Sequence, residues 1–137
     1  MRYLKIGLVL IIIFTVATIA IVNINTTRQS NNESRALNRI RQIRAAEETY
    51  QATKGAGKLA TLDQLIERGL VDKAVKDTAG GYTYSLTLHG DYEYELTASP
   101  IHSESYWRGG NKWYSADRGS IKEKTYMYGV AVEKEVR

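Results

Sequence analysis

The sequence predicts an α+β fold in which a long N-terminal helix packs on a small antiparallel sheet, with the first half of the helix spanning a membrane. Three patterns lead to this prediction. Residues Ile6 to Val22 are apolar apart from two threonines, residues Ser34 to Tyr50 repeat with the period of a helix, and residues Tyr82 to Ala98 alternate between apolar and polar side chains. A chain of 137 residues holds one domain and an anchor. The expected organisation is a transmembrane anchor over 1–24, a polar joint over 25–33 and a soluble domain over 34–137.

The apolar run is long enough to cross a bilayer. It reaches Ile24 when Asn23 is included, and a helix from Ile6 to Ile24 spans about 28 Å, close to a hydrocarbon thickness of about 30 Å. Arg2 and Lys5 precede the run, so the positive-inside rule places the N-terminus in the cytoplasm and the rest of the chain outside. The side chains expected to face lipid or neighbouring helices are those of Ile6, Leu10, Ile13, Phe14, Ala17 and Ile21.

Two other interpretations of the apolar run remain open. A cleaved signal peptide would use the small residues at Thr15 and Ala17, or at Thr18 and Ala20, at its cleavage site. A buried core helix is disfavoured because the run has no polar face.

The segment that follows the run, Asn23 to Asn32, reads NINTTRQSNN. Asparagine and threonine are poor helix formers whose side chains compete for backbone hydrogen bonds. The segment contains neither proline nor glycine, so nothing forces a break. It is therefore either a flexible joint or the weak part of one continuous helix.

A helix is predicted over 34–54. Its apolar stripe follows steps of three and four residues, and Gly55 and Gly57 end it. The arginines at 35, 39, 41 and 44 lie off this stripe, on a face that is solvated or that contacts anionic headgroups or acidic residues of a neighbouring subunit. The stripe consists of Leu37, Ile40, Ile43, Glu47 and Tyr50.

A short helix is predicted over 61–69. Thr61 and Gln64 have the spacing of a capping box, and Gly69 is placed to stop the helix. Asp72 is expected to cap one further turn that runs through Lys76.

Four antiparallel strands are predicted after Gly80-Gly81, over about 82–88, 92–98, 112–116 and 125–132. His89-Gly90-Asp91 turns the chain between the first two, which form a hairpin with one apolar face. Asp117-Arg118-Gly119 forms a second turn, with Ile121 on the returning chain, and the charged end 133–137 is expected to fray. The core between helix and sheet is expected to contain Leu37, Ile40, Ile43, Tyr50, Leu86 and Leu96.

The composition argues against an enzyme. There is no cysteine, which excludes disulfides, a thiolate metal site and a cysteine nucleophile, and no nucleotide-binding or zinc pattern is present. His89 and His102 fall in a turn and a loop, away from any nucleophile motif. Asp117 is the one metal candidate, yet its loop offers a single carboxylate where calcium takes about six to eight oxygens. We expect no catalytic residue and no cofactor.

Basic and aromatic residues mark a candidate interface. The net charge of +4 comes from interspersed charges, so no nucleic-acid partner is expected. Ten tyrosines against one phenylalanine are typical of half-exposed sheet faces or subunit interfaces. A glycine-flanked loop adds an aromatic pair next to an arginine, a combination common in interface hot spots. The candidate interface residues are Lys5, Arg41, Arg44, Tyr106, Trp107 and Arg108.

Five stretches of the chain form a recognisable series: Ile19–Asn23, Arg28–Tyr50, Leu62–Leu70 with Gly81–Tyr84, Tyr94–Pro100 and Trp113–Gly119. In this order they resemble the type IV pilin family, especially the pseudopilins of type II secretion, and together they cover residues 19 to 122. The resemblance implies a pilin-like fold and a structural subunit of an envelope filament or secretion pseudopilus. It further implies a bacterial inner membrane with the soluble domain periplasmic or extracellular. The implied partners are the bilayer, other copies or pilin-like subunits through the N-terminal helix, an assembly platform and an ATPase.

The N-terminus departs from the family pattern. Members are made with a short leader that a prepilin peptidase cuts after a glycine, and they carry a glutamate near the new N-terminus. Aligned on Ile19 to Asn23, Lys5 stands at the position of this glutamate and the cleavage glycine would precede Met1. With Gly7 as the leader glycine, Ile12 stands there instead. The departure favours an alternative function, a membrane-tethered binding or accessory module that has the pilin-like fold and does not polymerise.

Overall fold

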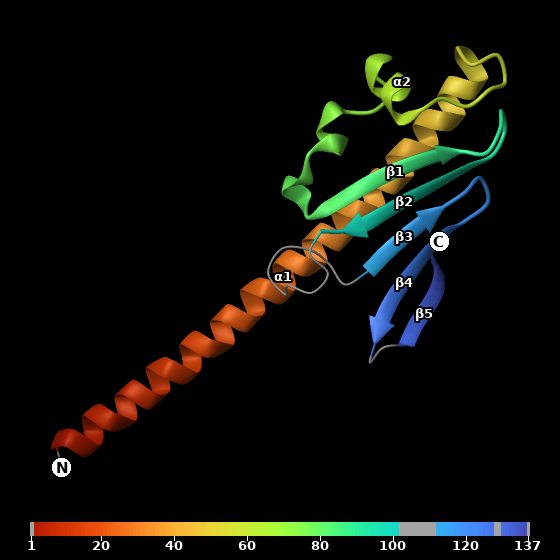
Figure 1. Ribbon diagram of the computed structural model, residues 1–137. Coiled ribbons are helices and arrows are strands. Elements are labelled where there is room, and N and C mark those ends of the chain that lie inside the picture. The colour runs from red at the N-terminus through yellow and green to blue at the C-terminus, as the bar shows by residue number, and fades with distance from the viewer. Residues whose placement is uncertain (1, 102–111, 128–129, 137) are drawn as a thin grey trace.

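The computed structural model describes residues 2–101, 112–127 and 130–136, except for the side chains of residues 2, 4, 5, 16–25, 79, 126 and 127. Within these ranges the fold is α+β, as the sequence predicts. One long helix lies against a sheet of five antiparallel strands and extends far beyond it at the N-terminal end (Figure 1).

Helix α1, Arg2–Thr53, is continuous, so the polar segment 25–33 lies within one helix. The helix ends where Lys54 and Gly55 both donate their N–H groups to the carbonyl of Tyr50, at 2.9 and 2.8 Å. A Cβ at Gly55 would come within 2.2 Å of the carbonyl oxygen of Lys58. Only glycine therefore fits where the chain leaves the helix.

The segment that crosses from α1 to the sheet contains helix α2, Leu62–Glu67, and the 3-10 helices η1, Lys73–Lys76, and η2, Thr78–Gly80. The predicted capping box at the start of α2 is confirmed, because Thr61 and Gln64 bond each other's backbone N–H groups. The predicted cap on η1 is confirmed as well, since Asp72 accepts a hydrogen bond from the N–H of Ala74 at 2.9 Å.

The sheet is a simple meander with the strand order β1-β2-β3-β4-β5. Two strands have the predicted bounds, and the strand predicted over 92–98 begins and ends two residues later. The N–H of His89 donates to the carbonyl of Glu93 at 2.8 Å, so the connection takes residues that the alternation assigned to the strand. The strands are β1 Tyr82–Leu88, β2 Tyr94–Pro100, β3 Lys112–Ala116, β4 Ile121–Met127 and β5 Val130–Val136.

The strand predicted over 125–132 is wrong. The chain instead forms β4 and β5, which pair from Ile121↔Val136 to Met127↔Val130. The end from 133 to 136, expected to fray, is part of this ladder. Its charges face opposite charges, Glu133 across from Lys124 and Glu135 across from Lys122. Opposite charges on facing positions stabilise a strand pair, so the charged pattern belongs to a strand.

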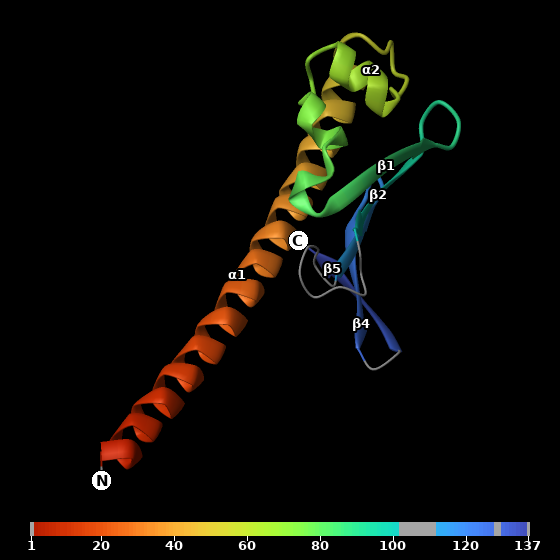
Figure 2. The same ribbon diagram turned by 60° about the vertical axis from the view of Figure 1, so that its left-hand side comes forward.

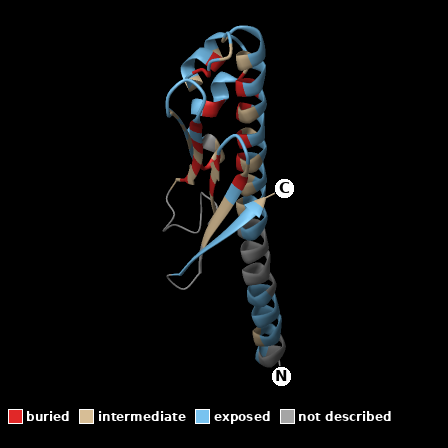
Figure 3. Ribbon diagram, turned by 90° about the vertical axis from the view of Figure 1, so that its right-hand side faces the viewer, coloured by how far each residue is buried: buried red, intermediate tan, exposed pale blue. Residues whose placement is uncertain are grey.

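The core lies between the C-terminal half of α1 and the sheet. Ile40, Ile43 and Leu96 are fully buried, and the other three predicted core residues, Leu37, Tyr50 and Leu86, are partly buried and pack against the core. Figure 3 shows the buried positions of α1 gathered where the helix lies against the sheet. Each fully buried aliphatic side chain contributes about 1.5–3 kcal/mol. Burial of this face therefore holds the C-terminal half of the helix on the domain.

Candidate assembly surface

The N-terminal part of α1 exposes large apolar side chains on every side. Eight of them are between 52% and 72% exposed: Ile6, Leu8, Val9, Leu10, Ile11, Ile12, Ile13 and Phe14. Consecutive positions on a helix point about 100° apart, so this run covers the whole circumference and leaves no polar face. Of the other predicted packing residues, Ala17 and Ile21 have side chains outside the described set, as does the interface candidate Lys5.

The exposed apolar surface favours association. Full burial of one such side chain contributes about 1.5–3 kcal/mol, so covering eight of them is worth on the order of 10 kcal/mol. The hydroxyl of Thr15, which follows this exposed stretch, already has hydrogen-bond partners. The hydroxyl of Thr15 donates within the helix to the carbonyls of Ile12 at 2.8 Å and Ile11 at 3.1 Å. A cover of purely apolar character would therefore leave this hydroxyl paired.

Measured over the described residues alone, no helix meets the length and apolarity needed to cross a bilayer.

A buried carboxyl group joins α1 to the segment before α2. Glu47 is fully buried, and its Oε2 accepts a hydrogen bond from the N–H of Ala60 at 3.0 Å. Burial raises the pKa of Glu47, and this hydrogen bond opposes the rise. The helical period placed Glu47 on the buried stripe but gave no sign of its partner, which lies thirteen residues away in an irregular segment.

Arg118, in the turn between β3 and β4, joins three segments. Its guanidinium donates to the carbonyl of Tyr92 at 3.1 Å and to Oε1 of Gln51 at 2.8 Å. Its own carbonyl accepts a hydrogen bond from Arg44 at 3.1 Å. The interface candidate Arg44 is thus used within the chain, while Arg41 lies exposed on the helix.

The metal candidate Asp117 accepts hydrogen bonds from the backbone of its own turn. Its Oδ1 accepts hydrogen bonds from the N–H groups of Gly119 and Ser120, both at 2.7 Å. These two donors lower the pKa of Asp117. The parts of the chain that the structure covers contain no group of three or more potential metal ligands. Asp117 therefore closes the turn between β3 and β4.

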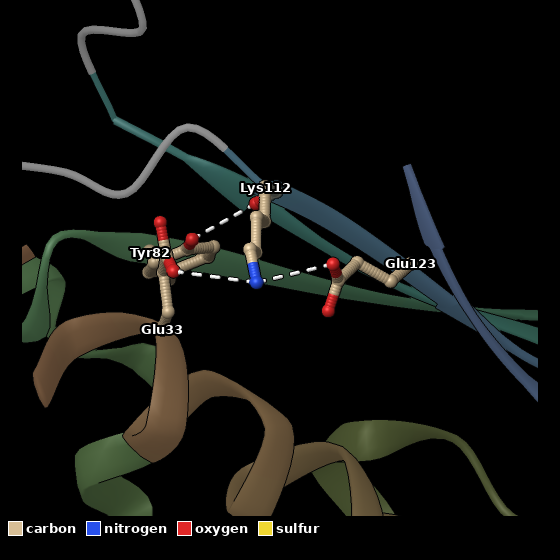
Figure 4. Close-up of polar contacts among 4 residues, drawn as sticks. All are labelled: Glu33, Tyr82, Lys112 and Glu123. Atoms are coloured by element: carbon tan, nitrogen blue, oxygen red, sulfur yellow. Dashed lines mark hydrogen bonds and ion pairs between the residues drawn. The ribbon is translucent and has the colours of Figure 1, made fainter. Parts of the chain in front are cut away.

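A half-buried ionic cluster ties α1 to the sheet and was not predicted (Figure 4). Nζ of Lys112 lies 3.1 Å from Glu123 on β4 and 3.8 Å from Glu33 on α1. The two carboxylate side chains are only 17% and 13% exposed. The backbone carbonyl of Lys112 also accepts a hydrogen bond from the hydroxyl of Tyr82 on β1, at 2.8 Å. The register of β3 and β4 would have predicted that Lys112 lies diagonally opposite Glu123. The contact with Glu33 could not be predicted, because it depends on how α1 docks on the sheet.

The interface candidates Tyr106, Trp107 and Arg108 lie outside the described residues, as does His102.

Comparisons with protein families, with curated proteins and with solved structures gave no match to this chain.

Proposed function

We propose that this protein is a structural subunit, pilin- or pseudopilin-like, of an envelope filament or secretion pseudopilus. One observation carries the proposal. A helix that continues without a break from a folded α+β domain exposes apolar side chains around its whole circumference over residues 6–14. A helix that is apolar on all sides is stable when lipid or other helices surround it. The order of sequence stretches that resemble pilins points in the same direction.

The proposed mechanism is mechanical. Before assembly, the apolar run lies in the inner membrane with the N-terminus in the cytoplasm and the domain outside. During assembly, runs from several copies bundle, so that each covers the others, and the domains interlock around them. Following the resemblance, an ATPase and an assembly platform insert or withdraw subunits. The chain itself supplies surfaces for packing and performs no chemistry.

A second candidate function is a membrane-tethered module that does not polymerise. The observation that favours it is Lys5, which stands where the pilin family has a glutamate. In the family the glutamate neutralises the N-terminal amine of a neighbour inside the apolar core. A lysine there adds positive charge to that environment, which opposes the bundling of identical helices.

Photo-crosslinking in intact cells separates the two candidates. A photoreactive phenylalanine analogue replaces Phe14, which is 72% exposed, and a control chain carries the same analogue at Glu67, on the polar surface of α2. The subunit proposal predicts a ladder of dimers, trimers and higher products from position 14 and far less product from position 67. Monomers with lipid adducts alone would contradict it and support the tethered module.

The N-terminal residue of the purified protein gives an independent test. A trimmed or methylated N-terminus supports processing as a pilin-like subunit, whereas an intact initiator methionine favours the tethered module.

A further inference from the structure

A pocket of about 440 Å³ lies between α1, the segment that contains η1 and η2, and the start of β1. Arg35, Asn38, Arg39 and Gln42 form its helical wall. Their spacing is i, i+3, i+4 and i+7, so all four lie along one stripe of the helix. Every one of these side chains donates hydrogen bonds, and two are cationic. The stripe therefore presents a row of donors to the inside of a concave surface.

The positive charge in the pocket is not neutralised by ion pairs. In the described part of the chain, no carboxylate forms an ion pair with Arg35 or Arg39. Asp77, the acidic residue of the lining, carries one negative charge against the two positive charges of the arginines, so a net positive charge remains in the pocket. Like charges four residues apart destabilise a helix. Two cations held this way beside Tyr84, whose side chain is half-buried, form a site for an anionic partner.

We propose that this pocket receives Glu93 and Glu95 of a second copy of the chain. This inference rests on the proposed function, because it names a contact between neighbouring subunits. Both glutamates are exposed and flank the buried Tyr94. Side chains two residues apart on an extended chain point the same way and lie about 7 Å apart. Arg35 and Arg39 are separated by about 6 Å along the helix axis, so two acid–base pairs form in register.

The positions of the two surfaces suit stacking along the helix axis. The guanidinium of Arg118 donates hydrogen bonds to both Tyr92 and Gln51. The turn between β1 and β2, which leads into Glu93 and Glu95, therefore lies at the level of Gln51 on α1. Gln51 lies about 18–24 Å beyond Arg39 and Arg35 along the axis, at about 1.5 Å per residue. Figure 2 shows the turn to β2 at one end of β1, and the pocket lining includes Tyr82 and Tyr84 at the other end of this strand. A neighbouring copy shifted by this distance along the axis brings its turn to the height of the pocket, and a contact between two different surfaces repeats into an open polymer.

Lipid headgroups are a poorer partner for these arginines. Val22 ends the apolar run, and Arg35 lies about 20 Å further along the helix. The pocket therefore stands clear of a bilayer that holds the run, whereas Arg28 is close to it. A protein carboxylate from a neighbour reaches this height without deforming the membrane.

Cysteine crosslinking between differently tagged copies tests the contact, since the chain has no cysteine of its own. One copy carries Arg39→Cys and the other Glu95→Cys, and both are expressed together as full-length chains. We expect a heterodimer on oxidation, and little product when Arg68→Cys, just after α2, replaces Arg39→Cys. Equal yields from the two pairs would overturn the assignment.

Charge exchange provides the second arm of the test. Arg39→Glu and Glu95→Arg are each expected to lower filament yield or photo-crosslinked ladder from position 14 by about tenfold, and the double exchange is expected to restore most of it. Single exchanges without effect, or a double exchange without recovery, would overturn this inference while a ladder from position 14 in the unchanged chain upholds the subunit proposal. Loss of that ladder in the unchanged chain would overturn both.

Discussion

At the scale of single residues, Glu47 contributes to the dependence of stability on pH. Its carboxyl group is fully buried, only one of its oxygens has a hydrogen-bond partner among the described residues, and burial raises its pKa. A raised pKa in the folded state means that folding favours the protonated carboxyl. The stabilising contribution of Glu47 is then complete below the pKa of the unfolded chain and is lost as the pH rises through the raised value.

Glu47→Gln is predicted to make the protein more stable at about pH 8 and to change little at about pH 4, because it removes a buried charge and keeps an oxygen for the N–H of Ala60. Glu47→Ala leaves that N–H unpaired and is expected to cost about 1–3 kcal/mol across the range. Denaturant unfolding of the full chain in detergent at several pH values measures both. A wild-type stability that rises with pH while Glu47→Gln follows it in parallel would contradict this explanation.

Lys112 links two half-buried carboxylates from different elements. Lys112→Ala is predicted to cost about 1–3 kcal/mol, because Glu33 and Glu123 would lose the cation that they share. Lys58→Ala is the matched control. Lys58 lies 3.1 Å from Asp91, but both side chains are more than half exposed, and such pairs contribute about 0–1 kcal/mol. Unfolding free energies in detergent give the comparison, and equal losses would show that the cluster around Lys112 adds nothing beyond a surface pair.

At the scale of elements, the two ends of the helical region follow local rules. The capping box at Thr61 and the cap at Asp72 were predictable because each depends on residues within three positions of one another. The end of α1 depends on a close approach instead, in which the chain folds back so that Lys58 lies against Gly55. The sequence predicted that Gly55 ends the helix, but it did not reveal the close approach of Lys58.

Gly55→Ala is predicted to destabilise the protein by about 1–3 kcal/mol, because its Cβ would come within 2.2 Å of a backbone oxygen, and the backbone would have to shift. Gly80→Ala serves as the control, since nothing lies within 4 Å of a Cβ placed there. Thermal unfolding of both variants under one condition makes the comparison. A loss at Gly80 that equals the loss at Gly55 would mean that the helix end is not constrained by packing.

The strands show where sequence patterns reach their limit. Alternation and turn residues gave β1 and β3 their bounds, because Gly80-Gly81 and Asp117-Arg118-Gly119 mark the ends directly. β2 starts later than its alternation suggests, since the bond from His89 to Glu93 extends the turn. The charges of β5 looked like those of a solvated tail, and only pairing with Lys122 and Lys124 shows them to be a ladder. The start of β2 and the existence of β5 depend on pairing with other segments of the chain, and a local sequence pattern does not reveal these partners.

At the scale of the whole molecule, the division of α1 into two environments is the main feature. Its C-terminal half buries Ile40 and Ile43 against the sheet, while residues 6–14 remain exposed on all sides. The sequence predicted both halves, because the first has no polar face and the second has a clear helical stripe. Two features depend on how the helix docks on the sheet and therefore could not be predicted from the sequence. They are the ionic cluster of Glu33, Lys112 and Glu123 and the pocket beside Arg39.

The same division predicts that association and folding are separable. Phe14→Lys is expected to abolish assembly, because it places a charge on an apolar surface where burial is costly, and to leave the unfolding of the domain unchanged in detergent. Glu67→Lys, on the surface of α2, is the matched control and is expected to assemble normally. Loss of domain stability in Phe14→Lys would contradict the separation.

The most direct measurement of the central claim is immunogold electron microscopy of filaments sheared from cells that express the tagged full-length chain, with cells that express Phe14→Lys as the control. The subunit proposal predicts regular label along filaments in the first case and no labelled filaments in the second. If the unchanged chain is absent from every filament and is recovered only as a monomer in detergent, the proposal is wrong.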